Sequence, residues 1–260
     1  MPLLSANLNV MEKACIKASK ALIRDFGEIE KIQVSKKGPG DFVTNADKRT
    51  EKILIKELTF ARPDYSILSE ECGAVEKNSE FKWIIDPIDG TLNFLHGVPH
   101  FAISIGLEKK NEIICGMIFN PITNEMFYAE KGKGAYLNNS RIRVSSRKKI
   151  EECILVTGGP ILKYENKEIF FREYEKVSRV VAATRKFGSA ALDLAFVACG
   201  RADGLWERNL SYWDIAGGIV IVKEAGGTIS DFKGGKDYVD GKNILATNSK
   251  IDKDLIEILS

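Results

Sequence analysis

The chain has 260 residues, of which 44% are apolar and 28% are charged, a composition typical of a globular protein with a substantial core. Its 38 basic and 36 acidic residues leave a net charge of +2, so no strong overall field favours nucleic acid as the main partner. The N-terminus lacks the pattern of a signal peptide, and no apolar run approaches the roughly 20 residues that span a bilayer. We therefore expect a soluble protein that does not contact a membrane.

Cysteine and histidine content narrows the kinds of site that the chain can build. The five cysteines are scattered and form no C-x-x-C pair, which suits reduced thiols better than a disulfide framework. The two histidines, His96 and His100, are too few for a histidine-rich zinc or iron site. We therefore expect a cytoplasmic protein without such a site.

The N-terminal segment predicts two helices joined by a loop. In residues 7–26 apolar side chains recur at three- and four-residue spacings, and the expected buried face is Leu8, Met11, Cys15, Ala18 and Leu22. Residues 36–40, Lys-Lys-Gly-Pro-Gly, are typical of a flexible basic loop. A second helix is expected from about Thr44 to Leu58.

The rest of the chain predicts a sheet followed by alternating strands and helices. Strands are expected at residues 65–68, 81–86, 101–107, 113–119, 126–130 and 135–144. After these come a strand at 154–157 and helices at 163–179, 189–199 and 214–224, the last ended by Gly226-Gly227. An antiparallel sheet carrying helices, then an α/β segment, predicts an N-terminal α+β subdomain over residues 1–145 and a C-terminal α/β subdomain over residues 146–260.

The most informative stretch is Asp86-Pro87-Ile88-Asp89-Gly90-Thr91, which follows the apolar run Trp83-Ile84-Ile85. Two carboxylates three residues apart at the end of a buried strand repel each other unless a cation lies between them. Oxygen ligands without histidine favour magnesium over zinc. Gly90-Thr91 can open a short helix, whose free N–H groups bind phosphate. A polar turn with Asp89 as a local cap is the alternative.

Three other acids can each be interpreted either as part of the site or as a local structural residue. Glu70, in Ser69-Glu70-Glu71, follows a short strand and is either a further ligand or part of a solvated acidic loop. Asp47, in Thr44-Asn45-Ala46-Asp47, also fits a helix capping box. Asp214 opens an apolar helix and could be its N-cap.

Taken together, these motifs resemble the inositol monophosphatase family, and within it the bacterial SuhB-like branch. The matching segments keep the family's order and spacing and cover nearly the whole chain: residues 40–47, 69–71, 83–94, 188–191 and 213–218. The resemblance implies a layered α/β sandwich (αβαβα) with the active site between its halves. It also implies a homodimer and a lithium-sensitive hydrolase.

The resemblance further implies a ligand set for two to three Mg²⁺ ions. The metal ligands would be Glu70, Asp86, Asp89, Asp214 and the backbone carbonyl of Ile88, with Asp86 bridging two ions. The backbone N–H groups of Gly90 and Thr91 would hold the phosphate, and Asp47 with Thr91 would orient the attacking water. Two ions about 3.5–4 Å apart stabilise both the attacking and the leaving oxygen of an in-line displacement. The residues with catalytic roles would therefore be Asp47, Glu70 and Thr91.

The expected substrate is a small phosphorylated polyol or sugar, with inositol monophosphate first. Its hydroxyls would meet Asp89, Asp214, Glu207 and the backbone of Gly188, Ser189 and Ala190. Glu207 could instead be a surface acid. Histidinol-phosphate, fructose-1,6-bisphosphate and nucleotide bisphosphate phosphatases are competing activities, the last disfavoured by the compact chain.

A regulatory role is the alternative of a different class. The SuhB-like branch is known for a role with the transcription and ribosomal RNA antitermination machinery. A basic stretch could serve such a partner here: Arg141, Arg143, Arg147, Lys148 and Lys149, with Thr184-Arg185-Lys186 further on. A solvated hairpin and loop would explain the same residues.

Overall fold

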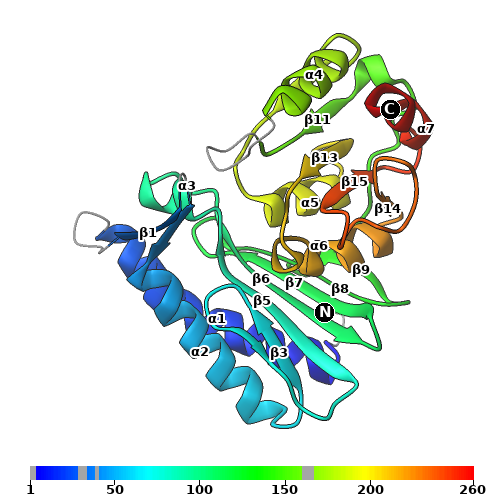
Figure 1. Ribbon diagram of the computed structural model, residues 1–260. Coiled ribbons are helices and arrows are strands. Elements are labelled where there is room, and N and C mark those ends of the chain that lie inside the picture. The colour runs from blue at the N-terminus through cyan, green and yellow to red at the C-terminus, as the bar shows by residue number, and fades with distance from the viewer. Residues whose placement is uncertain (1–3, 29–33, 39–40, 160–166) are drawn as a thin grey trace.

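The computed structural model describes residues 4–28, 34–38, 41–159 and 167–260, with the backbone alone for residues 34–38 and 41–43. Five layers follow one another: helices, a large sheet, helices, a smaller sheet, and helices (Figure 1). The αβαβα sandwich predicted from the sequence is confirmed. None of the helices in the described part of the chain is both long and apolar enough to cross a membrane.

The first outer layer consists of two helices, α1 (Ala6–Gly27) and α2 (Asn45–Ala61). The side chain of Ser5 accepts a hydrogen bond from the Leu8 amide and thereby starts α1, and a capping box of Thr44 and Asp47 starts α2. All five residues predicted for the buried face of the first helix are buried. A small ribbon of β1 (Val34–Gly38) and β2 (Asp41–Thr44) precedes α2.

The large sheet has eight strands in the order β10-β9-β8-β7-β6-β5-β3-β4. They are β3 (Ser66–Ser69), β4 (Gly73–Val75), β5 (Phe81–Asp89), β6 (Ala102–Lys109), β7 (Glu112–Asn120), β8 (Glu125–Glu130), β9 (Gly134–Leu137) and β10 (Ser140–Ile142). All neighbours pair antiparallel except β3 and β5, which are parallel. The short helix α3 (Thr91–Leu95) follows β5 at once.

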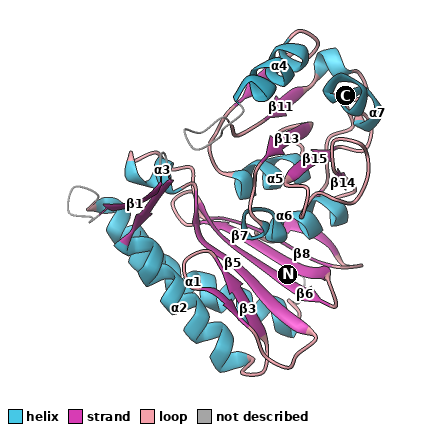
Figure 2. Cartoon of the chain, in the orientation of Figure 1, coloured by secondary structure: helices cyan, strands magenta, loops and turns pink. Residues whose placement is uncertain are grey.

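The smaller sheet has five strands in the order β12-β11-β13-β15-β14, and the chain's last helices cover its two faces (Figure 2). The strands are β11 (Ile154–Val156), β12 (Ala183–Arg185), β13 (Gly204–Arg208), β14 (Thr228–Ser230) and β15 (Asn243–Thr247). Helices α5 (Ala190–Ala198) and α6 (Tyr212–Glu224) lie between the two sheets, and α4 (Lys167–Ser178) and α7 (Asp252–Leu259) form the outer layer. A 3-10 turn, Ile150–Glu152, precedes β11.

Three apolar cores hold the five layers together. One joins α1 and α2 to the large sheet, a second joins both sheets to α5 and α6, and a third joins the smaller sheet to α4 and α7. Helix α6 approaches the large sheet closely because glycines face it: a Cβ on Gly116 would overlap the carbonyl oxygen of Gly217. This close approach places the start of α6 beside β5.

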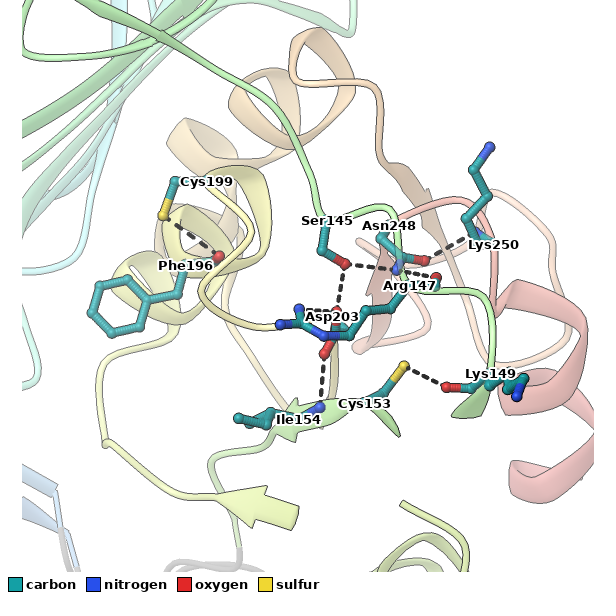
Figure 3. Close-up of polar contacts among 10 residues, drawn as sticks. All are labelled: Ser145, Arg147, Lys149, Cys153, Ile154, Phe196, Cys199, Asp203, Asn248 and Lys250. Atoms are coloured by element: carbon teal, nitrogen blue, oxygen red, sulfur yellow. Dashed lines mark hydrogen bonds and ion pairs between the residues drawn. The ribbon is translucent and has the colours of Figure 1, made fainter. Parts of the chain in front are cut away.

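Asp203 anchors the segment that joins the two sheets (Figure 3). Its buried carboxylate accepts hydrogen bonds from the Ser145 hydroxyl, from Arg147 at 3.1 Å and from the Ile154 amide at 2.7 Å. The side chain of Asn248 donates to both Ser145 and Arg147, at 2.9 Å each. The chain is therefore fixed where it passes from one sheet to the other, and the subdomain boundary proposed near residue 145 falls in this segment.

The structure corrects several predicted boundaries. Residues 36–38 belong to β1 and not to a loop, while 39–40 lie outside the described residues. The predicted strand 135–144 is two strands, β9 and β10, because the chain turns at Asn138, whose φ of 53° no strand accommodates. The predicted helix 163–179 corresponds to α4, Lys167–Ser178, and its predicted first residues, 163–166, lie outside the described part.

Candidate active site

A bulge in β5 brings its two aspartates to one place. In a regular strand, residues three apart point to opposite faces. Between Asp86 and Asp89 the register with β6 shifts, and Pro87 has no N–H to donate to the ladder. The Ile88 amide instead donates to the Asp86 carboxylate at 2.9 Å. The predicted end of the strand at Asp86 is therefore wrong by three residues, because the bulged chain returns to the sheet at Asp89.

Asp214 reaches the same place from helix α6. One carboxylate oxygen from each of Asp86, Asp89 and Asp214 lies within 4.8 Å of the other two. The N-cap of α6 is Ser211, not Asp214 as the alternative interpretation held: Asp214 is the third helical residue and accepts from the Ser211 amide at 2.7 Å. One oxygen therefore completes a capping box, so the helix start itself fixes this side chain.

Glu70 is held near these aspartates by a residue that sequence reasoning missed. The buried carboxylate of Glu51, on α2, accepts hydrogen bonds from the Ser69 hydroxyl, from the Glu71 amide at 2.9 Å and from the Cys72 amide at 3.2 Å. Glu51 thus secures both flanks of Glu70. Its spacing of four residues from Asp47, which puts both on one face of α2, is the signal that could have found it.

The buried carboxylates perturb one another. Burial raises the pKa of Asp86 well above its ordinary value, and the charge of Glu70 raises it further, followed by those of Asp89, Asp214 and Asp47. Burial also raises the pKa of Asp89 to about 6, although hydrogen bonds from Ser189 and the α5 backbone oppose the shift. Such a set of buried acids repels itself electrostatically unless some of its members are protonated or a cation neutralises their charge.

Asp47 and Thr91 face each other at the edge of this cluster. The Thr91 hydroxyl lies 3.3 Å from the Asp47 carboxylate and 3.0 Å from the carbonyl oxygen of Ile88. Burial is the main cause that raises the pKa of Asp47 to about 6. The Thr44–Asp47 capping box exists as well, so the capping and site interpretations of Asp47 describe one side chain in two contacts.

Gly90 forms the turn between β5 and α3. Its φ of 93° is left-handed, and a Cβ would lie 3.1 Å from the carbonyl oxygens of both Gly188 and His100. Only glycine fits such a turn without strain. Gly188, which is 98 positions further along the sequence, is thereby brought against the loop that follows Asp89.

The start of α5 holds Asp89 from the other half of the molecule. The Ser189 hydroxyl donates to Asp89 Oδ2, as does the Ala191 amide at 2.8 Å. Ser189 is buried, so its side chain supports a carboxylate rather than facing outward. Asn93 donates at 2.7 Å to the carbonyl oxygens of both His100 and Phe187, which fixes the same two segments to each other.

Glu207 is not a surface acid. It lies near the end of β13, is buried, and has one carboxylate oxygen without a hydrogen-bond partner among the described residues. Burial raises the pKa of Glu207 well above its ordinary value, and the charges of Asp193, Asp89 and Asp214 raise it further. A Cβ on Gly158 would overlap the Glu207 carboxylate, so this glycine gives Glu207 its space.

The residues present fit a hard divalent cation. Three aspartates converge, their oxygens are buried or half-buried, and no histidine or cysteine shares the cluster that they form. Like charges at this spacing are what a cation with oxygen ligands neutralises. The sequence therefore led to the residues that the fold brings together, and it missed the supports Glu51, Gly158 and Asn93.

An αβαβα sandwich whose aspartates meet between its halves defines an α/β protein with a candidate metal site, and the comparisons are more specific. The model of the inositol monophosphatase family matches residues 4–260. The inositol-1-monophosphatase of Mesorhizobium japonicum is 48% identical over 254 residues, which is 97% of this chain and 96% of that protein. The Nus factor SuhB of Haemophilus influenzae is 41% identical over 250 residues, covering 96% and 94% of the two chains.

The solved structures agree. The extragenic suppressor protein suhB from Bartonella henselae superposes with a TM-score of 0.96 at 47% identity, over 98% of this chain and 99% of that one. The chain belongs to the inositol monophosphatase family. This confirms the predicted family and places the chain among the phosphatases.

Proposed function

We propose that the chain is a magnesium-dependent phosphomonoesterase that hydrolyses inositol monophosphate or a similar small polyol phosphate. The observation that carries the proposal is the convergence of Asp86, Asp89 and Asp214 within 4.8 Å, with Glu70 close enough to perturb Asp86. Those residues and the Ile88 carbonyl would hold the metal. Bound Mg²⁺ supplies positive charge that neutralises phosphoryl oxygens and lowers the pKa of water.

In the proposed reaction, water attacks phosphorus, the bond from phosphorus to the polyol oxygen breaks, and the polyol leaves with a proton. Thr91 can orient the attacking water, since its hydroxyl lies between the Asp47 carboxylate and the Ile88 carbonyl. Asp47, with a pKa near 6, can accept a proton at neutral pH. No covalent phosphoenzyme is needed, because positioning and charge neutralisation do most of the work in phosphoryl transfer.

The polyol is expected at the side where the two halves meet. Glu207, Asp89 and Asp214 present carboxylates there, and the backbone of Gly90, Gly188 and Ala190 lies alongside. Buried carboxylates bind an alcohol whose hydroxyls can donate hydrogen bonds to them, and they bind one that lacks these hydroxyls much more weakly. These assignments support an inositol or sugar phosphate, and the sequence relatives named inositol-1-monophosphatase favour inositol.

A panel of substrates tests the proposal. We expect the largest kcat/KM for inositol 1-phosphate at pH 7.5 with Mg²⁺, inhibition by lithium, and little turnover after EDTA treatment. Faster turnover of histidinol phosphate or fructose 1,6-bisphosphate would change the proposed substrate and leave the proposed reaction, phosphomonoester hydrolysis, in place. Failure of every phosphomonoester with a folded, Mg²⁺-loaded protein would overturn the proposal.

A regulatory function is a second candidate, because relatives at about this similarity are named Nus factor SuhB. The side chains of Arg141, Arg143 and Lys148 are exposed, whereas Arg147 is bound to Asp203. We propose that the exposed cations could meet a partner of the transcription machinery. Binding of purified transcription factors to an Asp89→Asn variant at wild-type affinity would support this function, and its loss in an Arg141/Arg143/Lys148 triple alanine variant would locate it.

Two further expectations remain proposals. A cytoplasmic location is supported by the five cysteines, all of which are free thiols. A homodimer is the form that the family resemblance implies, and sedimentation of the purified chain tests it.

A further inference from the structure

A buried histidine–aspartate pair, His100 and Asp193, lies next to the segments that contact Asp89 and has no part in the proposed chemistry. Asp193, in the first turn of α5, is fully buried, and neither of its carboxylate oxygens has a hydrogen-bond partner among the described residues. His100 Nε2 is also buried without a partner there, and it lies 4.0 Å from Asp193 Oδ1. Buried polar groups without partners are rare, so two that face each other need a physical explanation.

The surroundings of the pair are aromatic rings and further acids, one of which, Glu125, acts on His100 through its charge. The His100 ring packs against Phe187 and Phe196, with centroids 5.3 and 5.5 Å away. Asp193 is close enough to Asp89 and Glu207 for their charges to act on one another. Burial raises the pKa of Asp193 and lowers that of His100, so an uncharged pair sharing a proton adds no charge beside Asp89.

Each member of the pair belongs to a segment that touches Asp89. Asp193 lies on the turn of α5 whose Ser189 hydroxyl and Ala191 amide donate to Asp89. His100 lies two residues before Ala102, the residue of β6 that pairs with Asp89. A hydrogen bond between the two side chains, about 1 Å shorter than the present separation, would tie these segments together across the carboxylate.

We propose that His100 and Asp193 form a positioning pair that holds the first turn of α5 against Asp89 and so fixes the orientation of the Asp89 carboxylate. The consequence for metal binding rests on the proposed function, but the mechanical role does not. Neither residue touches the reacting atoms. Supports of this kind behind metal ligands typically change metal affinity when they are removed.

The experiment compares Asp193→Asn, His100→Phe and the double variant with the wild type, each first shown to be folded. Hydrogen exchange of the peptide that covers residues 189–194 is measured without metal, and Mg²⁺ binding is measured by calorimetry. We expect each single variant to exchange faster at this peptide and to bind Mg²⁺ about tenfold more weakly. The double variant is expected to bind Mg²⁺ no more weakly than the single variant with the lower Mg²⁺ affinity, because the two residues act as one unit.

Two control variants separate this role from general destabilisation. Asp203→Asn removes an acceptor from an equally buried aspartate that anchors the segment between the sheets, and His96→Gln changes the other, exposed histidine. Both are expected to leave the 189–194 peptide and Mg²⁺ binding as in the wild type. If Asp193→Asn does not fold, His100→Gln provides the same comparison.

The outcomes are distinguishable. Wild-type exchange at residues 189–194 in the folded single variants overturns the proposal, and so do effects on Mg²⁺ binding that multiply in the double variant. A wild-type protein that binds no Mg²⁺ contradicts the proposed function. In that case the exchange measurement alone decides the role of the pair.

Discussion

The hydroxyl of Thr91 lies 3.3 Å from a carboxylate oxygen of Asp47, which is 44 residues away in the sequence. Thr91 is the first residue of α3 and Asp47 belongs to the first turn of α2, so two helix starts meet at the carboxylate cluster. Both ends of this contact are fixed by other bonds, to the Ile88 carbonyl on one side and to Thr44 on the other. The pair is therefore held in place before any substrate arrives.

Removal of this hydroxyl tests its role in orienting water. Thr91→Val is expected to lower kcat about a hundredfold, the smaller end of what a positioned proton-transfer group contributes. KM and Mg²⁺ affinity should stay near wild type, since the carboxylates are untouched. Thr91→Ser keeps the hydroxyl and is the matched control. A Thr91→Val enzyme with kcat within twofold of wild type would show that the contact is structural.

Magnesium binding should depend on pH because protons and cations compete for the same carboxylates. The pKa values of Asp47 and Asp89 in the metal-free protein are raised to about 6, so the folded protein keeps protons that the unfolded chain has lost. These groups therefore cost stability as pH rises from about 4 through 6. Bound Mg²⁺ removes that cost, and the rise in Tm on adding Mg²⁺ should be large at pH 7.5 and small at pH 5. An equal rise at both pH values would contradict the assignment.

A substitution at Gly158 tests Glu207 as a substrate contact without changing the carboxylates proposed to bind Mg²⁺. A Cβ at this position would displace the Glu207 carboxylate, so Gly158→Ala is expected to lower kcat/KM about tenfold or more. Most of the effect should be in KM for the polyol substrate, with Mg²⁺ affinity unchanged. Gly27→Ala, where no atom lies within 4 Å of the new Cβ, is the control. Normal kinetics in Gly158→Ala would exclude Glu207 as a substrate contact.

Asp203 should matter for stability and not for catalysis. Asp203→Asn loses an acceptor for at least one of three donors and is expected to cost about 1–3 kcal/mol in the free energy of unfolding. Urea denaturation measures this cost. Turnover at 25 °C should be unchanged, because Asp203 anchors the segment that joins the two sheets and not the carboxylates of the site (Figure 3). A catalytic defect without loss of stability would show that this segment communicates with the site.

Local patterns predicted much of the fold and the aspartates that converge in it. The spacing of Leu8, Met11 and Leu22 determined the buried face of α1, and the run from Trp83 to Thr91 indicated a metal and phosphate site. These signals work because amphipathic periodicity and a strand that ends in acids are properties of neighbouring residues.

Contacts between distant residues could not be predicted in this way. The bulge after Asp86 depends on pairing with β6, and Ser189 donates to a carboxylate 100 positions earlier. Glu51 and Gly158 carry no motif of their own, and their roles follow only from what the fold places against them. Tertiary structure decides these contacts, so the supporting residues were missed, whereas the aspartates that the fold brings together were predicted from their motifs.

The central claim is that Asp86, Asp89 and Asp214 bind the magnesium on which phosphate release depends. Its most direct test is phosphate release from inositol 1-phosphate by the wild type and by Asp214→Asn, with Mg²⁺ and with EDTA. The account predicts turnover only in the wild type with Mg²⁺, and an Asp214→Asn protein that stays folded by circular dichroism. Wild-type turnover in EDTA, or in folded Asp214→Asn, would contradict it.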